Sequence, residues 1–158
     1  MSLLFYDMEV FKYNWLIVVL DMANRKKHVI WDDPDWLAEL HKQHVNDIWC
    51  GYNSRHYDQY ILKGILLGFN AKEINDWIIV KGQDGWRFSN AFNKVRLINY
   101  DVMPNPPIGL KTLEGFMGNT IKESSVSFDI NRPLTNAEKA EVEKYCTHDT
   151  EQACEGFM

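Results

Sequence analysis

The first third of the chain alternates apolar segments with short polar turns, a pattern typical of successive β-strands. Residues 3–9, 15–20 and 28–31 are apolar or rich in β-branched side chains. Between them stand the polar runs Lys12-Tyr13-Asn14 and Asn24-Arg25-Lys26-Lys27. Because each connection is only a few residues long, we expect consecutive strands to pair antiparallel as a meander.

The rest of the chain mixes helical patterns with two further apolar strands. Apolar residues recur at helical spacing in several segments, whereas two short runs are continuously apolar. We expect helices from residue 33 onward, over 54–67, around 71–80, over 109–117 and from 135 to near the end, and strands over 47–51 and 95–100. The sequence therefore predicts an α/β fold, a mixed five-stranded sheet with helices on both faces.

The last helix has the clearest start signal. Thr135 and Glu138 have the spacing of a capping box, in which each side chain bonds the other residue's backbone N–H. Further along, Tyr145 and Asp149 are four residues apart, so they should be neighbours on one helix face.

Size and composition fit one folded domain, spanning residues 1–158. Hydrophobic residues make up 46% of the chain, but no apolar run approaches the ~20 residues that cross a membrane. Three cysteines without a Cys-x-x-Cys spacing favour a reducing, cytoplasmic compartment. The net charge of −5 argues against a protein that coats nucleic acid with a broad basic surface, but not against a nuclease with a small metal-filled pocket.

Three short frames contain the acidic residues of most interest: Asp7 and Glu9 in residues 5–10, Asp58 in residues 53–58, and Asp149 in residues 145–149. Each frame alone is common, but the ordered set is expected by chance in fewer than about one chain in a hundred. Carboxylates suit hard cations such as Mg²⁺ or Mn²⁺, and a two-metal site of this kind most often acts on phosphate esters. No set of zinc ligands is recognisable, since His41 and His44 lack further partners in the sequence.

Simpler explanations exist for each residue. Asp7 and Glu9 could face solvent on an edge strand, although their apolar flanks indicate a central strand in which paired carboxylates repel unless a cation lies between them. Asp58 could be an ordinary first-turn acid favoured by the helix dipole. Tyr145 could be a core aromatic with its hydroxyl at the surface.

The ordered set resembles the DEDD superfamily of 3′–5′ exonucleases, and the tyrosine four residues before Asp149 resembles its Tyr-type branch. The segments Gly109-Leu110-Lys111-Thr112-Leu113 and Asn131-Arg132-Pro133 are similar to the proofreading domain of phage protein-primed family B DNA polymerases. The resemblance implies an RNase H-like sheet of three antiparallel and then two parallel strands.

The resemblance also implies roles for the metal-site residues. Asp7 would bridge two Mg²⁺ or Mn²⁺ ions, Glu9 and Asp149 would complete the first ion's coordination, and Asp58 would hold the second. Because a tyrosine hydroxyl is a poor base at neutral pH, Tyr145 would orient the attacking water instead.

Four further residues are candidates for substrate binding. By resemblance, Asn53 would touch the strand near its 3′ end and Lys111 would lie near the scissile phosphate. Phe11 and Tyr57 could stack on terminal bases, although aromatic side chains of this kind are more common in cores.

We therefore expect a 3′–5′ exonuclease that acts on the 3′ end of single-stranded DNA. We expect the chain to be one domain of a larger phage-like polymerase, or excised from one, and to function in a bacterial host cell. A polymerase module in the same or a partner chain would be its partner, and no membrane is expected. The alternatives are an RNA-trimming exonuclease of RNase D type and a catalytically silent nucleic-acid-binding domain. Carboxylates and metals alone would equally permit an endonuclease.

Overall fold

The computed structural model describes residues 2–102 and 124–157, and its centre is a five-stranded mixed sheet. The strands are β1 (Leu3–Val10), β2 (Trp15–Asp21), β3 (Lys26–Trp31), β4 (Ile48–Gly51) and β5 (Ile98–Asp101), in the spatial order β3-β2-β1-β4-β5. The first three pair antiparallel, whereas β4 runs parallel to both β1 and β5. The predicted α/β fold with an RNase H-like arrangement is confirmed.

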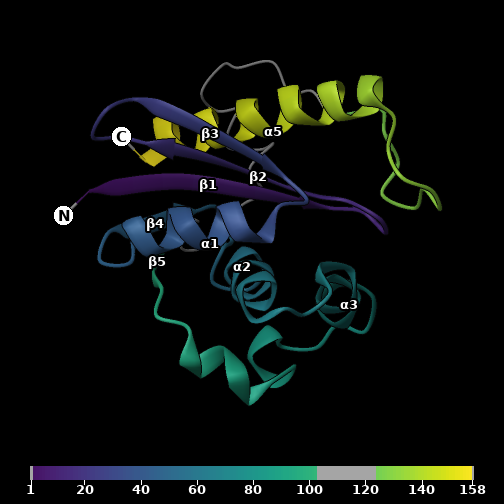
Figure 1. Cartoon of the computed structure of the whole chain (residues 1–158), viewed down its shortest axis with the longest axis horizontal. Coiled ribbons are helices and arrows are strands. Elements are labelled where there is room, and N and C mark those ends of the chain that lie inside the picture. The colour runs from purple at the N-terminus through teal and green to yellow at the C-terminus, as the bar shows by residue number, and fades with distance from the viewer. Residues whose placement is uncertain (1, 103–123, 158) are drawn as a thin grey trace.

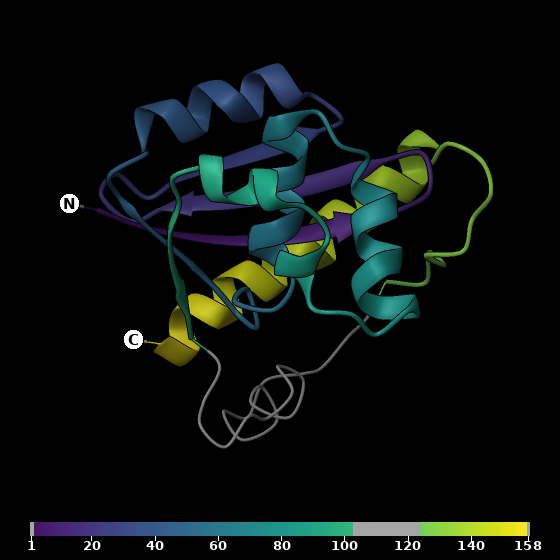
Figure 2. The same ribbon diagram turned by 90° about the horizontal axis from the view of Figure 1, so that it is seen from below.

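Helices cover both faces of this sheet (Figure 1). On one side lie α1 (Pro34–Gln43), α2 (Asp58–Leu67) and α3 (Ala71–Asn75). On the other side the long α5 (Asn136–Phe157) packs across β1 and β2. Seen from below, α2 and α3 stand in front of the strands while α5 crosses behind them (Figure 2). Within the described residues, no helix combines the length and apolar character needed to cross a membrane.

Side chains along β1 alternate between the two faces of the sheet, and the two sets pack against different helices. Its even-numbered residues belong to the large core cluster that includes residues of α1 and α2. Phe5 instead packs with Cys154 of α5 on the opposite face. Since successive side chains on a strand point to opposite faces, Asp7 and Glu9 belong to the α5 side of the sheet.

Some element boundaries differ from the sequence prediction. The strand expected from residue 95 begins at Ile98, because residues 90–94 form a 3₁₀ helix and the Val95 N–H closes it by donating to the Phe92 carbonyl oxygen at 3.2 Å. The helical segment 71–80 divides into α3 and a π-helix, Asp76–Val80. The helix expected over 109–117 lies outside the described residues.

The start of α5 forms as predicted. The Thr135 N–H donates to Glu138 Oε1 at 2.8 Å, and the Glu138 N–H donates to Thr135 Oγ1 at 3.2 Å. Arg132 adds a 2.7 Å ion pair to the same glutamate. This reciprocal cap fixes where the helix begins, and therefore which of its residues face β1.

Candidate metal centre

The acidic pair on β1 lies just beyond the point where β1 loses its parallel neighbour. Pairing with β4 ends at Phe5, opposite Cys50, whereas pairing with β2 continues through Asp7 and Glu9. The carboxyl end of β1 is therefore held on one side only. The two carboxylates are therefore held in place by a paired strand. In the part of the chain that the structure describes, the neighbour of this part of β1 on the β4 side is the loop that follows β4 and not another strand.

Asp58 approaches the pair from that side. It is the first residue of α2, and only 4% of its surface is exposed. Burial raises its pKa well above the ordinary carboxyl value, and the nearby carboxylates of Asp7 and Glu9 raise it further. Three acids from two distant parts of the sequence thus lie near enough for the charges of Asp7 and Glu9 to act on Asp58.

The segment before Asp58 is a turn and not the start of the helix, which corrects the prediction of a helix from residue 54. Asn53 has φ 58°, and Tyr57, inside the predicted helix, has φ −140° and ψ −73°; neither conformation is α-helical. The Asp101 carboxylate accepts the backbone N–H groups of Asn53 at 2.9 Å and Arg55 at 3.1 Å. The Ser54 hydroxyl donates to the Gly51 carbonyl oxygen at 3.1 Å.

Asp101 is therefore a positioning residue that the sequence prediction did not identify. It ends β5 directly beside Gly51 at the end of β4, and the turn it holds leads into Asp58. The sequence signal for this role was an acid at the end of an apolar strand. Its meaning depends on the neighbouring strand being the one that precedes Asn53. That signal has meaning only once β4 and β5 are known to be neighbours.

Cys146 of α5 is the second residue that the sequence prediction missed. It is 1% exposed, and its Sγ lies 3.5 Å from Asp7 Oδ2 and 3.6 Å from the Asp7 carbonyl oxygen. One ligand atom from each of Asp7, Glu9 and Cys146 falls within 4.8 Å of the others. Burial, followed by the charges of Asp7 and Glu9, raises the pKa of the Cys146 thiol well above its usual value.

Asp149 and Tyr145 are both half-buried on α5, on either side of Cys146. The Asp149 carboxylate is near enough to contribute to the raised pKa of the Cys146 thiol. The Tyr145 ring lies under Lys144, with Nζ 5.9 Å from the ring centroid. Among the described residues that line the cavity beside the acids, neither Tyr145 nor Asp149 appears, so their predicted roles stay predictions.

That cavity has a volume of about 510 Å³ and has two unlike parts. Asp7, Glu9 and Asp58 line its acidic part. The π-helix lines the other part with Ile79 and Val80, which are 64% and 74% exposed although apolar. A volume of this size suits a small-molecule ligand or one residue of a polymer.

A hydrogen bond ties the two parts of the cavity together. The hydroxyl of Tyr57, immediately before Asp58, donates to Asn75 Oδ1 at the end of α3. Burial and then the charge of Asp58 raise the pKa of the Tyr57 hydroxyl, so it keeps its donor proton at neutral pH. Asn75 directly precedes the π-helix, so this bond helps to fix the apolar wall relative to the acids.

The predicted substrate-binding residues do not all line the cavity. Asn53 and Tyr57 line the cavity. Phe11 is only 3% exposed, and its ring stacks on that of Phe128 at 4.9 Å between centroids. Phe128 is 51% exposed and lines the cavity, so it offers the aromatic face that was expected of Phe11. Lys111 lies outside the described residues.

No protein-family model, curated protein or solved structure matches this chain. A functional conclusion therefore depends on the geometry and chemistry of the site itself.

Proposed function

We propose that this chain is a 3′–5′ exonuclease that removes nucleotides from the 3′ end of single-stranded DNA with two Mg²⁺ or Mn²⁺ ions. The observation that carries the proposal is the convergence of Asp7, Glu9 and Asp58 on one cavity. They come from a strand and from the start of a helix about fifty residues later. Carboxylates crowded in this way, one of them buried, favour bound cations because like charges cannot all ionise cheaply without them.

The donor set fits hard cations. Asp7, Glu9 and Asp58 offer carboxylate oxygens, the ligands that Mg²⁺ and Mn²⁺ prefer. Two such ions, when bound, would stabilise the charge that develops on the attacking and leaving oxygens of a phosphodiester. Under this proposal Asp7, Glu9 and Asp149 would hold one ion, and Asp7 and Asp58 would hold the other.

The apolar side of the cavity supports a nucleotide as the substrate unit. Ile79, Val80 and Phe128 expose apolar surface and line the same cavity as the acids. A base whose phosphate lies at the carboxylates would place its flat face on this wall. A paired base would first have to unstack at a cost of a few kcal/mol, so the geometry favours single-stranded or frayed ends.

The test is a timed digestion of a 5′-labelled single DNA strand with Mg²⁺ or Mn²⁺, resolved by length. A ladder that shortens one nucleotide at a time is expected, faster from unpaired than from paired ends, and a 3′-phosphate should block it. Asp7→Asn should lower the rate by about 10²- to 10³-fold, the range for loss of one electrostatic stabiliser. Asp47→Asn, the same change at the other end of the sheet, should leave the rate unchanged.

Other outcomes would overturn parts of the proposal. Immediate internal fragments would indicate an endonuclease on the same fold. A matched RNA strand shortened faster than DNA would indicate an RNA-trimming enzyme. Absence of cleavage with both metals, in protein that still binds the strand, would indicate a silent binding domain.

A further inference from the structure

A thiol lies inside the acidic pair of β1. Cys146 comes from α5, and its Sγ is 3.5 Å from Asp7 Oδ2. Glu9 contributes the third donor atom within 4.8 Å. Magnesium and manganese have little affinity for sulfur, so the proposed function gives this thiol no task.

One donor-to-donor distance, between the Cys146 sulfur and an Asp7 oxygen, has the length expected in a tetrahedral metal site. Zinc–sulfur bonds are about 2.3 Å and zinc–oxygen bonds about 2.0–2.2 Å. At the tetrahedral angle these lengths put sulfur and oxygen roughly 3.6 Å apart. The observed 3.5 Å between Cys146 Sγ and Asp7 Oδ2 therefore needs almost no rearrangement to become one edge of such a site.

The two carboxylates of the trio are accessible from the cavity, whereas the thiol is buried. Asp7 and Glu9 line the 510 Å³ cavity, whereas Cys146 approaches them from the buried side of α5. An ion in the cavity can therefore reach the carboxylates, and the Cys146 sulfur lies within 4.8 Å of an oxygen of each. A water molecule on the cavity side would complete four-coordination.

We propose that Asp7, Glu9 and Cys146 form a binding site for a thiophilic divalent cation, Zn²⁺ or its analogue Cd²⁺. Binding releases the thiol proton to solvent and converts Cys146 to a thiolate ligand. The ion occupies the same carboxylates as Mg²⁺, so it displaces Mg²⁺ and, given the proposed function, inhibits cleavage. The site could not be recognised from the sequence, because Cys146 is well over a hundred residues away from the two acids.

The chain provides its own controls. Cys50 and Cys154 are buried with Phe5 in a separate apolar cluster, and Cys154 Sγ lies 3.6 Å from Met22 Sδ. All three cysteines are free thiols. A protein with Cys50→Ala and Cys154→Ala keeps only the thiol beside the acids, whereas Cys146→Ser removes that thiol and retains a small polar side chain there.

The experiment titrates the metal-free protein with Cd²⁺ and records sulfur-to-metal charge-transfer absorption, with Zn²⁺ affinity measured by competition. The double variant should keep the absorption, and Cys146→Ser should lose it. Cys146→Ser should weaken Zn²⁺ binding by more than about 100-fold, beyond the usual cost of losing an outer-shell contact. Its stabilisation by Mg²⁺ should match that of the wild type.

Two results would overturn the inference. Absorption that survives Cys146→Ser but disappears in the double variant would place the soft cation at Cys50 and Cys154. Equal Zn²⁺ affinity in wild type and Cys146→Ser would make the thiol a packing residue only. These readouts need no activity, so a chain that binds Cd²⁺ through Cys146 but never cleaves DNA would refute the proposed function and leave the site standing.

Discussion

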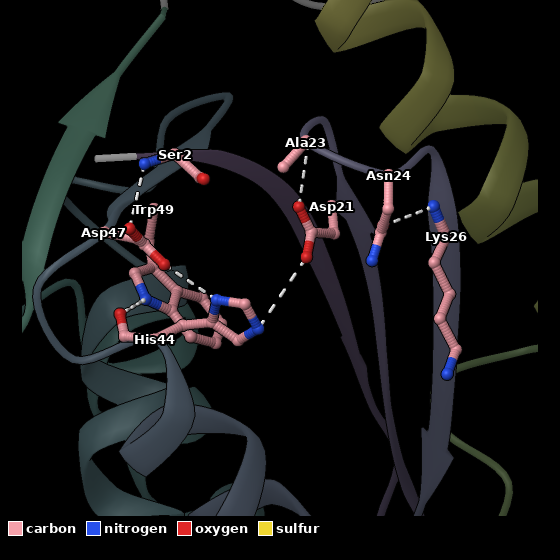
Figure 3. A network of polar contacts seen from close by, with 8 residues as sticks. All are labelled: Ser2, Asp21, Ala23, Asn24, Lys26, His44, Asp47 and Trp49. Atoms are coloured by element: carbon pink, nitrogen blue, oxygen red, sulfur yellow. Dashed lines mark hydrogen bonds and ion pairs between the residues drawn. The ribbon is translucent and has the colours of Figure 1, made fainter.

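Carboxylates gather at both ends of β1, and the two groups have opposite surroundings. Beside the start of the strand, Asp47 accepts the Ser2 N–H at 2.9 Å and lies 2.8 Å from His44 Nδ1. Asp21 accepts the Ala23 N–H at 2.9 Å, and its other oxygen is 3.7 Å from His44 Nε2. Figure 3 shows the His44 ring between the two acids.

The pKa directions express this difference. The pKa of Asp47 is lowered, first by the Ser2 N–H and then by His44. The pKa of Asp58, at the other end, is raised by burial and by its acidic neighbours Asp7 and Glu9. Hydrogen-bond donors around an acid favour its ionised form, whereas neighbouring carboxylates disfavour it, so the two ends of the strand should respond oppositely to pH.

Metal binding should give the largest effect on stability. Mg²⁺ or Mn²⁺ at about a hundred times its dissociation constant should add about 2.7 kcal/mol to the free energy of unfolding. For a chain of this size that raises the melting temperature by roughly 5–10 °C. Thermal unfolding with and without metal measures it. An equal shift in Asp7→Asn would place the metal elsewhere.

Asp101 lies at the acidic end of the sheet but, like Asp47, accepts hydrogen bonds from backbone N–H groups. Its replacement therefore tests whether such an acid stabilises the fold there too. Asp101→Ala leaves the Asn53 and Arg55 N–H groups without this acceptor and should cost about 1–3 kcal/mol of stability. Activity should fall in parallel, since the turn that leads to Asp58 loosens. Denaturant unfolding measures the loss, and Asp101→Asn, which keeps one acceptor oxygen, should recover part of it. Unchanged stability in Asp101→Ala would show that the turn does not depend on this carboxylate.

Asp58→Asn should stabilise the metal-free protein near neutral pH, by about 1 kcal/mol, because a neutral amide replaces a carboxyl group whose ionised form is disfavoured by burial and like charges. The raised pKa of Asp58 means that the folded state binds the proton more tightly than the unfolded state does. The contribution of Asp58 to wild-type stability should therefore be largest below the ordinary carboxyl pKa and fall as pH rises through the raised value. The variant should lack this fall. Unfolding in chelator across pH would refute the idea if both proteins behaved alike.

Asp47→Asn should have the smallest effect and the opposite sign, a loss of about 0.5–1 kcal/mol at neutral pH. Its lowered pKa means that the stabilisation is present above the ordinary carboxyl pKa and is lost as pH falls through the lowered value. The gap between wild type and variant should close in acid. A gap that widens in acid would contradict the assignment.

Much of the fold could be predicted because its signals are local. The spacing of Asp7 and Glu9 on an apolar strand, and the Thr135–Glu138 capping box, involve residues within a few positions of one another. Backbone geometry alone relates such residues, so the pattern suffices. Asp58 was predicted near the start of a helix for the same reason, and it is the first residue of α2.

The sequence by itself therefore determined the α/β class, the meander and the four acids worth testing. Only the tertiary structure decided that Cys146, and not a residue of an obvious motif, faces Asp7, and that Asp101 reaches across from β5 to hold the turn before Asp58. It also placed the apolar wall of the π-helix beside the acids. These relations depend on which strands are neighbours and on how α5 is rotated against the sheet. Long-range packing of the whole core sets both, and no short stretch of sequence encodes either.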